Sequence, residues 1–160
     1  MSLQTLYHIA LVIHITGLTM LAGTTLADYI MTKQFWKQFA IDKQQAVAIN
    51  KAMSKLVLLF GIGILLLILS GVGMMWLTNG MWGEQLWFRI KFVLVIIIII
   101  NGLAVGRRQG NQLRKLVPLE AAGEDTGTKL LKVRTVINRF HIIQLALFIL
   151  VFVLSVFKFN

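Results

Sequence analysis

Hydrophobic residues occur in four long blocks along the chain, and short polar segments separate them. The blocks cover residues 3–27, 56–77, 86–105 and 136–157. Each has about 20 residues, the length of α-helix that crosses a hydrocarbon core about 30 Å thick. Uninterrupted apolar runs lack the alternation of membrane β-strands, so sheets are excluded. The pattern predicts an all-α polytopic membrane protein, an up-down-up-down four-helix transmembrane bundle that forms one domain over residues 1–160.

The first block could be a signal peptide, because a small-residue cleavage site ends it near residue 27. No Lys or Arg precedes the block, however, and its apolar part is long for a signal peptide. We therefore expect it to remain as the first membrane helix.

Basic residues are concentrated in two of the three connections. Residues 28–55 contain five Lys and two Asp, and residues 107–139 contain eight basic and three acidic residues. The positive-inside rule makes the connections 28–55 and 106–135 cytoplasmic, with both termini outside a bacterial-type inner (plasma) membrane. The formal charge of +10 thus indicates topology and affinity for the anionic headgroups of the lipid bilayer, and nucleic acid is not an expected partner.

The helices are expected to extend beyond the bilayer into the cytoplasm. Asp42 followed by Gln45 resembles a capping box that opens another helix. The third helix is expected to continue to Pro118, where a flexible linker over residues 118–129 begins. Three aromatic residues form a belt after the first block: Phe35, Trp36 and Phe39.

Ionisable residues inside the apolar blocks are candidate functional residues, because each costs about 2.5–3.5 kcal/mol to insert into lipid. In the first block, His14 shares a helical face with Asp28, and His8 lies about 120° away. The fourth block begins with Asn138, His141 and Gln144, a stripe expected to face the bundle. Whether His141 is structural or functional stays open.

The third block begins with two cations, Arg89 and Lys91, that point in different directions around the helix. Arg89 lies near the predicted outer boundary, where its charge can reach the headgroups by snorkelling. Lys91 lies deeper and shares a face with Trp87. For Lys91, snorkelling and an inward, functional orientation are both open.

Depth along the membrane decides which of these residues can cooperate. His8 and Lys91 lie roughly 6–8 Å below the outer boundary, and His14 lies near the midplane. His141 enters from the cytoplasmic side, roughly 20 Å from the level of His8. The sequence therefore predicts a shared pocket in the outer-leaflet half between the first and third spans, formed by His8, Lys91, His14 and Trp87.

Cysteine is absent, which excludes disulfides, thiolate metal sites and covalently attached haem. Any haem or metal would need His, Met, Lys or carboxylate ligands. A group of thioethers near the second connection could hold Cu(I), because copper prefers soft sulfur ligands. Methionine is equally an ordinary filler of apolar gaps. The thioethers belong to Met74, Met75 and Met81.

Three motifs resemble known membrane proteins: "LYHIALVIHITG" in the first block, "INKAMSKL" before the second and "WFRIK" at the third. The layout is similar to that of the HemJ-type protoporphyrinogen oxidases. The resemblance implies that His8 and the pair Trp87 and Lys91 bind haem b or a porphyrin, with His8 as an axial ligand of the haem iron. Lys91 would be the second ligand or would anchor a propionate, and the protein would be a haem-dependent membrane oxidoreductase.

The chain departs from the HemJ-type pattern at two positions. Arg89 stands where that family usually has His, and Glu84 stands where it has Arg, a natural partner for a porphyrin propionate. The layout is also similar, more loosely, to CopD-type copper-associated proteins, which implies copper handling through Met74, Met75, Met81 and His8. A non-catalytic membrane subunit is a third hypothesis. A homodimer through the glycine-bearing second span, and a redox partner or quinone, are the further partners considered.

Overall fold

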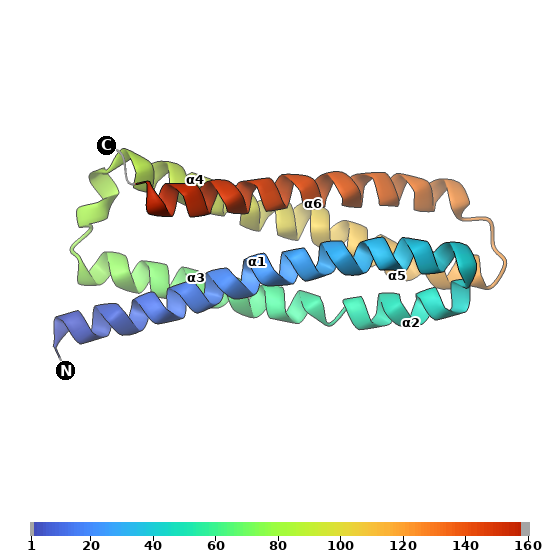
Figure 1. Ribbon diagram of the computed structural model, residues 1–160, viewed down its shortest axis with the longest axis horizontal. Helices are drawn as coiled ribbons and strands as arrows, with labels where there is room; N and C mark the ends of the chain where they lie inside the picture. Colours follow the sequence, from blue (N-terminus) through green and yellow to red (C-terminus); the bar gives the residue numbers. More distant parts are fainter. Residues whose placement is uncertain (1, 158–160) are drawn as a thin grey trace.

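Each apolar block forms part of a long helix in the computed structural model (Figure 1). The structure describes residues 2–157, so Met1 and residues 158–160 of the predicted domain lie outside the described residues. The described residues form helices and no strand. The elements in order are α1 (Leu3–Ile41), α2 (Lys43–Met53), α3 (Leu56–Leu77), the 3-10 helix η1 (Met81–Glu84), α4 (Leu86–Asn101), the π-helix η2 (Gly102–Gly106), α5 (Arg107–Ala121) and α6 (Gly127–Val156).

Four stretches of the described chain are long and apolar enough to cross a membrane. They run alternately in opposite directions along the long axis of the molecule (Figure 1). This confirms the all-α, four-helix membrane bundle. The stretches are Leu3–Ile41, Lys43–Leu77, Leu86–Ala121 and Gly127–Val156.

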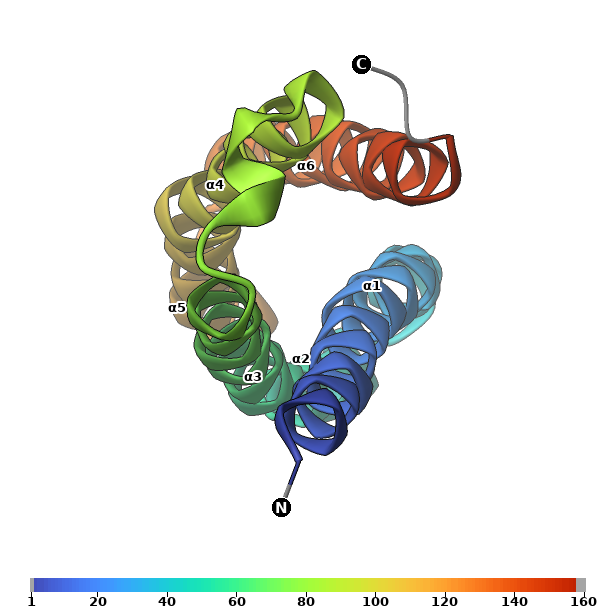
Figure 2. The ribbon, with the colours of Figure 1, turned by 90° about the vertical axis from the view of Figure 1, so that its left-hand side faces the viewer.

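The molecule has two halves along its long axis. The termini half consists of residues 2–22, 63–98 and 145–157, and the α2 half consists of residues 23–62 and 99–144 (Figure 1). α1 packs on α3 in the termini half and on α2 in the other, and α6 packs on α4 and then on α5. Seen end-on, the helices form an arc with α1 and α6 at its two ends (Figure 2).

Two glycines bring the backbones of α1 and α3 together in the termini half. A Cβ atom on Gly17 would lie 2.8 Å from the backbone nitrogen of Leu67, and one on Gly63 would lie 3.1 Å from the carbonyl oxygen of Gly17. Small residues permit such close approach between membrane helices, where packing replaces the hydrophobic effect as the force for association. The buried core of this half consists of Leu21, Leu67, Ile98, Phe148 and Val151.

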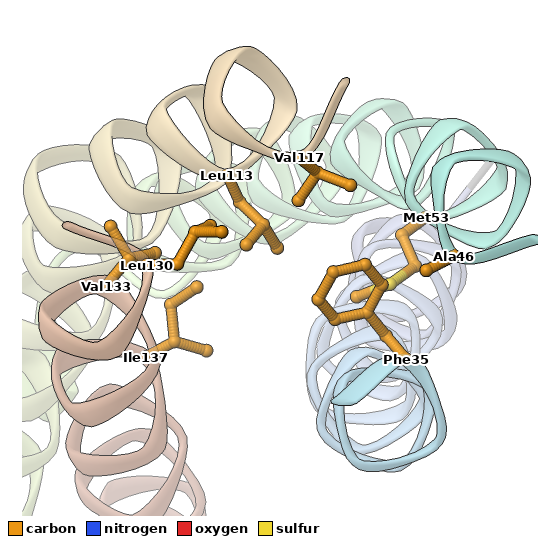
Figure 3. Close-up of a cluster of buried hydrophobic side chains, with 8 residues drawn as sticks. All are labelled: Phe35, Ala46, Met53, Leu113, Val117, Leu130, Val133 and Ile137. Atoms are coloured by element: carbon orange, nitrogen blue, oxygen red, sulfur yellow. The ribbon is translucent and has the colours of Figure 1, made fainter. Parts of the chain in front are cut away.

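A second core lies in the α2 half, where α1, α2, α5 and α6 surround it (Figure 3). Its residues on α6 follow the three-and-four spacing of an amphipathic helix. Exposed cations lie on the other faces of α2 and α5, including Lys51 and Arg108, as expected of segments that extend beyond a bilayer. The core residues are Phe35, Ala46, Met53, Leu113, Val117, Leu130, Val133 and Ile137.

Asp42 separates α1 from α2 and caps the second helix. Its Oδ1 accepts hydrogen bonds from the backbone N–H groups of Gln44 and Gln45, at 2.8 and 3.1 Å. These bonds satisfy two amides that have no partner within the helix. The Gln45 side chain accepts a hydrogen bond from Gln38. The predicted N-cap is therefore correct, whereas the reciprocal half of a capping box does not form.

The predicted linker over residues 118–129 is wrong in its extent. α5 continues through Pro118 to Ala121, and α6 begins at Gly127. Proline removes one backbone donor, and Pro118 lies in the last turn of α5, where few further helical bonds depend on that turn. The helices therefore continue almost to their connection, which covers only residues 122–126.

Glu120 holds this short connection in place. Its Oε2 accepts hydrogen bonds from the backbone N–H and the hydroxyl of Thr126, both at 2.8 Å, and its Oε1 lies 3.0 Å from the Lys43 ammonium. The Thr126 hydroxyl above all, and Lys43 next, lower the pKa of Glu120 to about 2. One carboxylate thus links α2, α5 and the start of α6.

Candidate functional site

A cavity of about 730 Å³ lies in the α2 half, next to the core of that half. Residues of α1, α2, α3, η2, α5 and α6 line it, so each of the four membrane-length stretches contributes to its wall. The volume lies within the range of small-molecule sites, which are mostly apolar with a few placed polar groups. The polar lining includes Thr24, Thr25, Asp28, Thr32, Asn50 and His141.

Asp28 of α1 and His141 of α6 form an ion-pair contact in the cavity wall. His141 Nε2 donates a hydrogen bond to Asp28 Oδ2 at 2.8 Å. The imidazole is fully buried, whereas the Asp28 side chain is 35% exposed. The ring of Tyr29 lies edge-on to the imidazole at 5.7 Å. The pair therefore presents a partly accessible carboxylate whose partner cannot reach solvent.

Several buried polar groups around this pair have no protein partner. The Nδ1 atom of His141 is buried without a hydrogen bond among the described residues. Thr32 and Asn50 are 2% and 6% exposed, and within residues 2–157 neither side chain takes part in a hydrogen bond. Buried polar groups are nearly always paired with protein or with a bound molecule. The cavity wall thus carries hydrogen-bonding capacity that the chain itself does not use.

The π-helix η2 forms the opposite wall. A Cβ atom on Gly102 would lie 2.6 Å from Phe60, and one on Gly106 would lie 2.8 Å from Phe140. The two glycines are four residues apart, so they lie on one side of the helix and receive one ring each. π-helical turns often occur at functional sites. Here the turn places the Phe60 and Phe140 rings against bare backbone beside the cavity.

Polar contacts fix α6 against α4 at the beginning of η2. Gln144 is fully buried; its Nε2 donates to the carbonyl of Ile98 at 2.9 Å, and its Oε1 accepts from Asn101 at 2.8 Å. Hydrogen bonds of this kind commonly join membrane helices. They confirm that the stripe containing His141 and Gln144 faces the bundle.

The predicted outer pocket residues lie in the termini half. His14 Nδ1 donates to the Ser70 hydroxyl at 3.0 Å, because that hydroxyl donates in turn to the carbonyl of Leu66. Lys91 is half-buried in the second turn of α4.

The other two residues of that predicted pocket have different surroundings. Trp87 is buried at 6% exposure, and its ring lies 6.0 Å from that of Trp82. His8 is exposed on the first part of α1, where its ring lies beside Tyr7. A haem or porphyrin pocket in this half stays a prediction.

The cation at the start of the third span has a local partner. Arg89 Nε donates to the carbonyl of Gly83 at 2.8 Å, which ties α4 to η1. The methyl group of Met75 lies close to Gly83. Met74 is half-buried and Met81 is 60% exposed. The predicted thioether group thus lies around η1, and copper binding there stays a prediction.

The pair of Asp28 and His141 was not predicted from the sequence. Asp28 directly follows the first apolar block and therefore reads as part of the polar connection. His141 is distant in depth from His8, the histidine of the predicted pocket. A signal is present, because Asp28 at the end of the first block and His141 near the start of the fourth lie toward the same side of an up-and-down bundle, on faces expected to point into it. Matching residues by depth across all four helices would have found the pair.

Comparison with known proteins gives a family and no described activity. The model of a family described as "Predicted integral membrane protein (DUF2269)" matches residues 8–159, which is nearly the whole chain. No curated protein and no solved structure shows significant similarity. The resemblance to HemJ-type and CopD-type proteins therefore stays a prediction. With four apolar helices and a family match over almost its full length, the chain belongs to the DUF2269 family of predicted integral membrane proteins.

Proposed function

We propose that this integral membrane protein binds a small organic molecule in the cavity of the α2 half. One observation carries the proposal: Nδ1 of His141 is buried in a residue of the cavity wall and has no hydrogen-bond partner among the described residues. An unsatisfied buried polar group costs about 1–3 kcal/mol. A bound molecule that pairs with this atom would remove that cost, and Thr32 and Asn50 add further polar groups to the same wall.

The pair of Asp28 and His141 gives the site its chemistry. The carboxylate is partly accessible to a ligand, and the imidazole behind it is held by the 2.8 Å hydrogen bond. Such a pair accepts a hydrogen bond or a proton from a bound hydroxyl or amine, because a carboxylate backed by an imidazole can share the charge change. The positive-inside rule predicts that the α2 half, and with it this site, faces the cytoplasm.

Purification from native membranes tests the proposal. We expect native mass spectrometry of the detergent-solubilised protein to show a small molecule bound to the wild type. Asn50→Leu and Thr32→Val should lose it, because both remove polar atoms from the cavity wall. Thr19→Val is the matched control, since Thr19 is exposed and bonds only its own helix at Ile15. Retention by both cavity variants, or a wild type without any bound molecule, would contradict the proposal.

Haem b in the termini half is the second candidate function, and the hydrogen bond between His14 Nδ1 and Ser70 favours it. A histidine that ligates a metal usually donates its other ring N–H to a protein acceptor. His14 has this arrangement, because its Nδ1 donates to Ser70 and Nε2 keeps its lone pair. His14 therefore fits an axial position, with Lys91 available for a propionate. A bound haem would supply electron transfer.

Absorption spectra of the purified protein, oxidised and then reduced, test this second candidate. We expect a Soret band that His14→Ala abolishes and that His8→Ala keeps, since His8 is exposed. A protein that stays colourless after haem addition would exclude it. Metal analysis of the same sample separates copper held by Met74, Met75 and Met81 from haem iron.

A further inference from the structure

The cavity of the α2 half extends around α3 toward the membrane. The face of α3 that packs on α1 contains Gly63 and Leu67. Most of the α3 residues that line the cavity lie on the opposite face of the helix, by the spacing of 3.6 residues per turn. Five of the seven lining residues of α3 are on that opposite side, namely Val57, Leu58, Gly61, Ile62 and Leu65, whereas Leu56 and Phe60 lie on or beside the face that packs on α1. A single cavity therefore reaches from Asp28 in the bundle to the far side of α3.

The seam between α3 and the helix formed by η2 and α5 is the opening on that far side. The α3 backbone packs closely on α1 but lies apart from the backbones of α4, η2 and α5, and the Phe60 side chain of α3 crosses this gap to Gly102 of η2. Leu58 and Leu65 of α3 are 69% and 57% exposed, and Leu103 of η2 is 50% exposed, yet all three line the cavity. Apolar residues that line a cavity and also face lipid form an entrance that favours an apolar group over water.

The two ends of the cavity have opposite character. Thr32, Asn50 and the pair of Asp28 and His141 supply hydrogen-bond donors and acceptors at the bundle end. Leucine and glycine residues form the seam. A ligand that matches both ends has a compact polar head and an apolar tail.

The charge at the bundle end argues for an uncharged head. Asp28 is the acidic residue in the cavity wall, and it would repel a phosphate. The basic residues of the wall, Arg107 and Arg114, lie on α5. The Phe60 and Phe140 rings beside Gly102 and Gly106 offer aromatic surface to a flat group.

We infer that the ligand is a membrane-dissolved lipid with an uncharged ring head and one apolar tail, of the quinone class. It enters between α3 and η2–α5 from the leaflet on the α2 side. This inference rests on the proposed function, since it names the ligand of the same cavity. The head oxygens would accept hydrogen bonds from Thr32 and Asn50, and in the reduced, quinol form a head hydroxyl would donate to the Asp28 carboxylate. The tail would lie in the seam along Leu58 and Leu65.

Matched leucine substitutions at two glycines of α3 test the entrance. A Cβ atom on Gly61 or on Gly73 would have no other atom within 4 Å, so both variants of α3 should fold normally. Only Gly61 of the two lines the cavity. With a decyl-tailed benzoquinone titrated into nanodiscs, we expect Gly61→Leu to raise Kd at least about tenfold and Gly73→Leu to leave it unchanged. Gly110→Leu, on the α5 side of the seam, provides a second variant with the same expected effect.

Three probes separate this inference from the proposed function. Binding of the tailed quinone in preference to tail-less benzoquinone supports the inference. Equal affinity for the two quinones, or an unchanged Kd in Gly61→Leu and Gly110→Leu, overturns lateral entry while the cavity remains a binding site. Displacement of the quinone by phosphatidylglycerol overturns the uncharged head. Failure of every probe, together with a purified protein that carries no small molecule, overturns the proposed function itself.

Discussion

The termini half and the α2 half each place an ionisable residue of α1 toward a neighbouring helix. In the termini half this residue lies in a closed interface, whereas in the α2 half it lies in the wall of a cavity. α1 carries His14 in one half and Asp28 in the other, on the same helical face. His14 is satisfied by Ser70 across a closed interface. Asp28 is satisfied by His141 at the edge of a cavity of about 730 Å³. The surroundings of each residue, more than its type, decide whether it can meet a ligand.

The positions of glycine explain much of why the helices pack closely in the termini half and leave a cavity in the α2 half. Gly17 and Gly63 face one another across two backbones, so the absence of side chains is used to bring α1 and α3 together. Gly102 and Gly106 face the Phe60 and Phe140 rings, which hold η2 away from α3 and α6 by the width of a side chain. Small residues thus close one half and leave room in the other.

Overpacking the closed half should have the largest effect on stability. In Gly17→Leu the new Cβ would lie 2.8 Å from the Leu67 backbone nitrogen, so α1 and α3 must separate. We expect the free energy of unfolding to fall by about 3 kcal/mol or more, the upper end of the usual cost of overpacking. Thermal unfolding in detergent measures this loss. Gly23→Leu on the same helix is the control, because its Cβ meets nothing within 4 Å. Equal losses in the two variants would show that α1 and α3 do not pack as described.

Breaking the pair in the open half should have a smaller but substantial effect. His141→Leu leaves the Asp28 carboxylate without its partner, and we expect a loss of about 1–3 kcal/mol. Asp28→Asn combined with His141→Leu should recover part of that loss, since no charge is then unpaired. A double-mutant cycle measures this coupling. Strict additivity of the two substitutions would mean that the pair does not form.

Removing the polar partner in the closed half should cost less. Ser70→Ala takes away the hydroxyl that accepts the His14 hydrogen bond, and we expect a loss of about 0.5–1.5 kcal/mol in the free energy of unfolding. Ser155→Ala is the control, because Ser155 bonds only the carbonyl of Val151 on its own helix. If Ser155→Ala lowers the free energy of unfolding as much as Ser70→Ala does, the hydrogen bond between His14 and Ser70 does not form.

The smallest effect should come from the connection outside the membrane, and it depends on pH. Hydrogen bonds from Thr126 and the Lys43 ammonium hold the pKa of Glu120 at about 2, below its ordinary value of 4.5. The carboxylate therefore stabilises the folded state above about pH 4.5, and this contribution disappears as the pH falls toward 2. We expect the difference in Tm between wild type and Glu120→Gln to shrink over that window. Glu124→Gln, at an exposed position in the same connection, should show no such trend.

The presence of four helices of membrane-spanning length followed from the sequence because lipid imposes a simple rule. An apolar run that must satisfy its own backbone hydrogen bonds forms a helix, and α3 begins and ends at the predicted residues 56 and 77. Asp42 was predicted correctly as a cap, because capping depends on neighbours two and three residues away. Pro118 misled the prediction, since a helix whose last turn is held by Glu120 and Thr126 continues past it.

The sequence by itself thus determined the class of protein, the number of spans and which residues are costly to place in lipid. Only the tertiary structure decided which of those residues meet. Asp28 and His141 are 113 positions apart, and their contact depends on where α1 crosses α6. That crossing is set by Gly17 against Gly63 and by Gln144 against Ile98. Helix propensity and hydrophobicity act along the chain, whereas contact between helices depends on packing that no single segment contains.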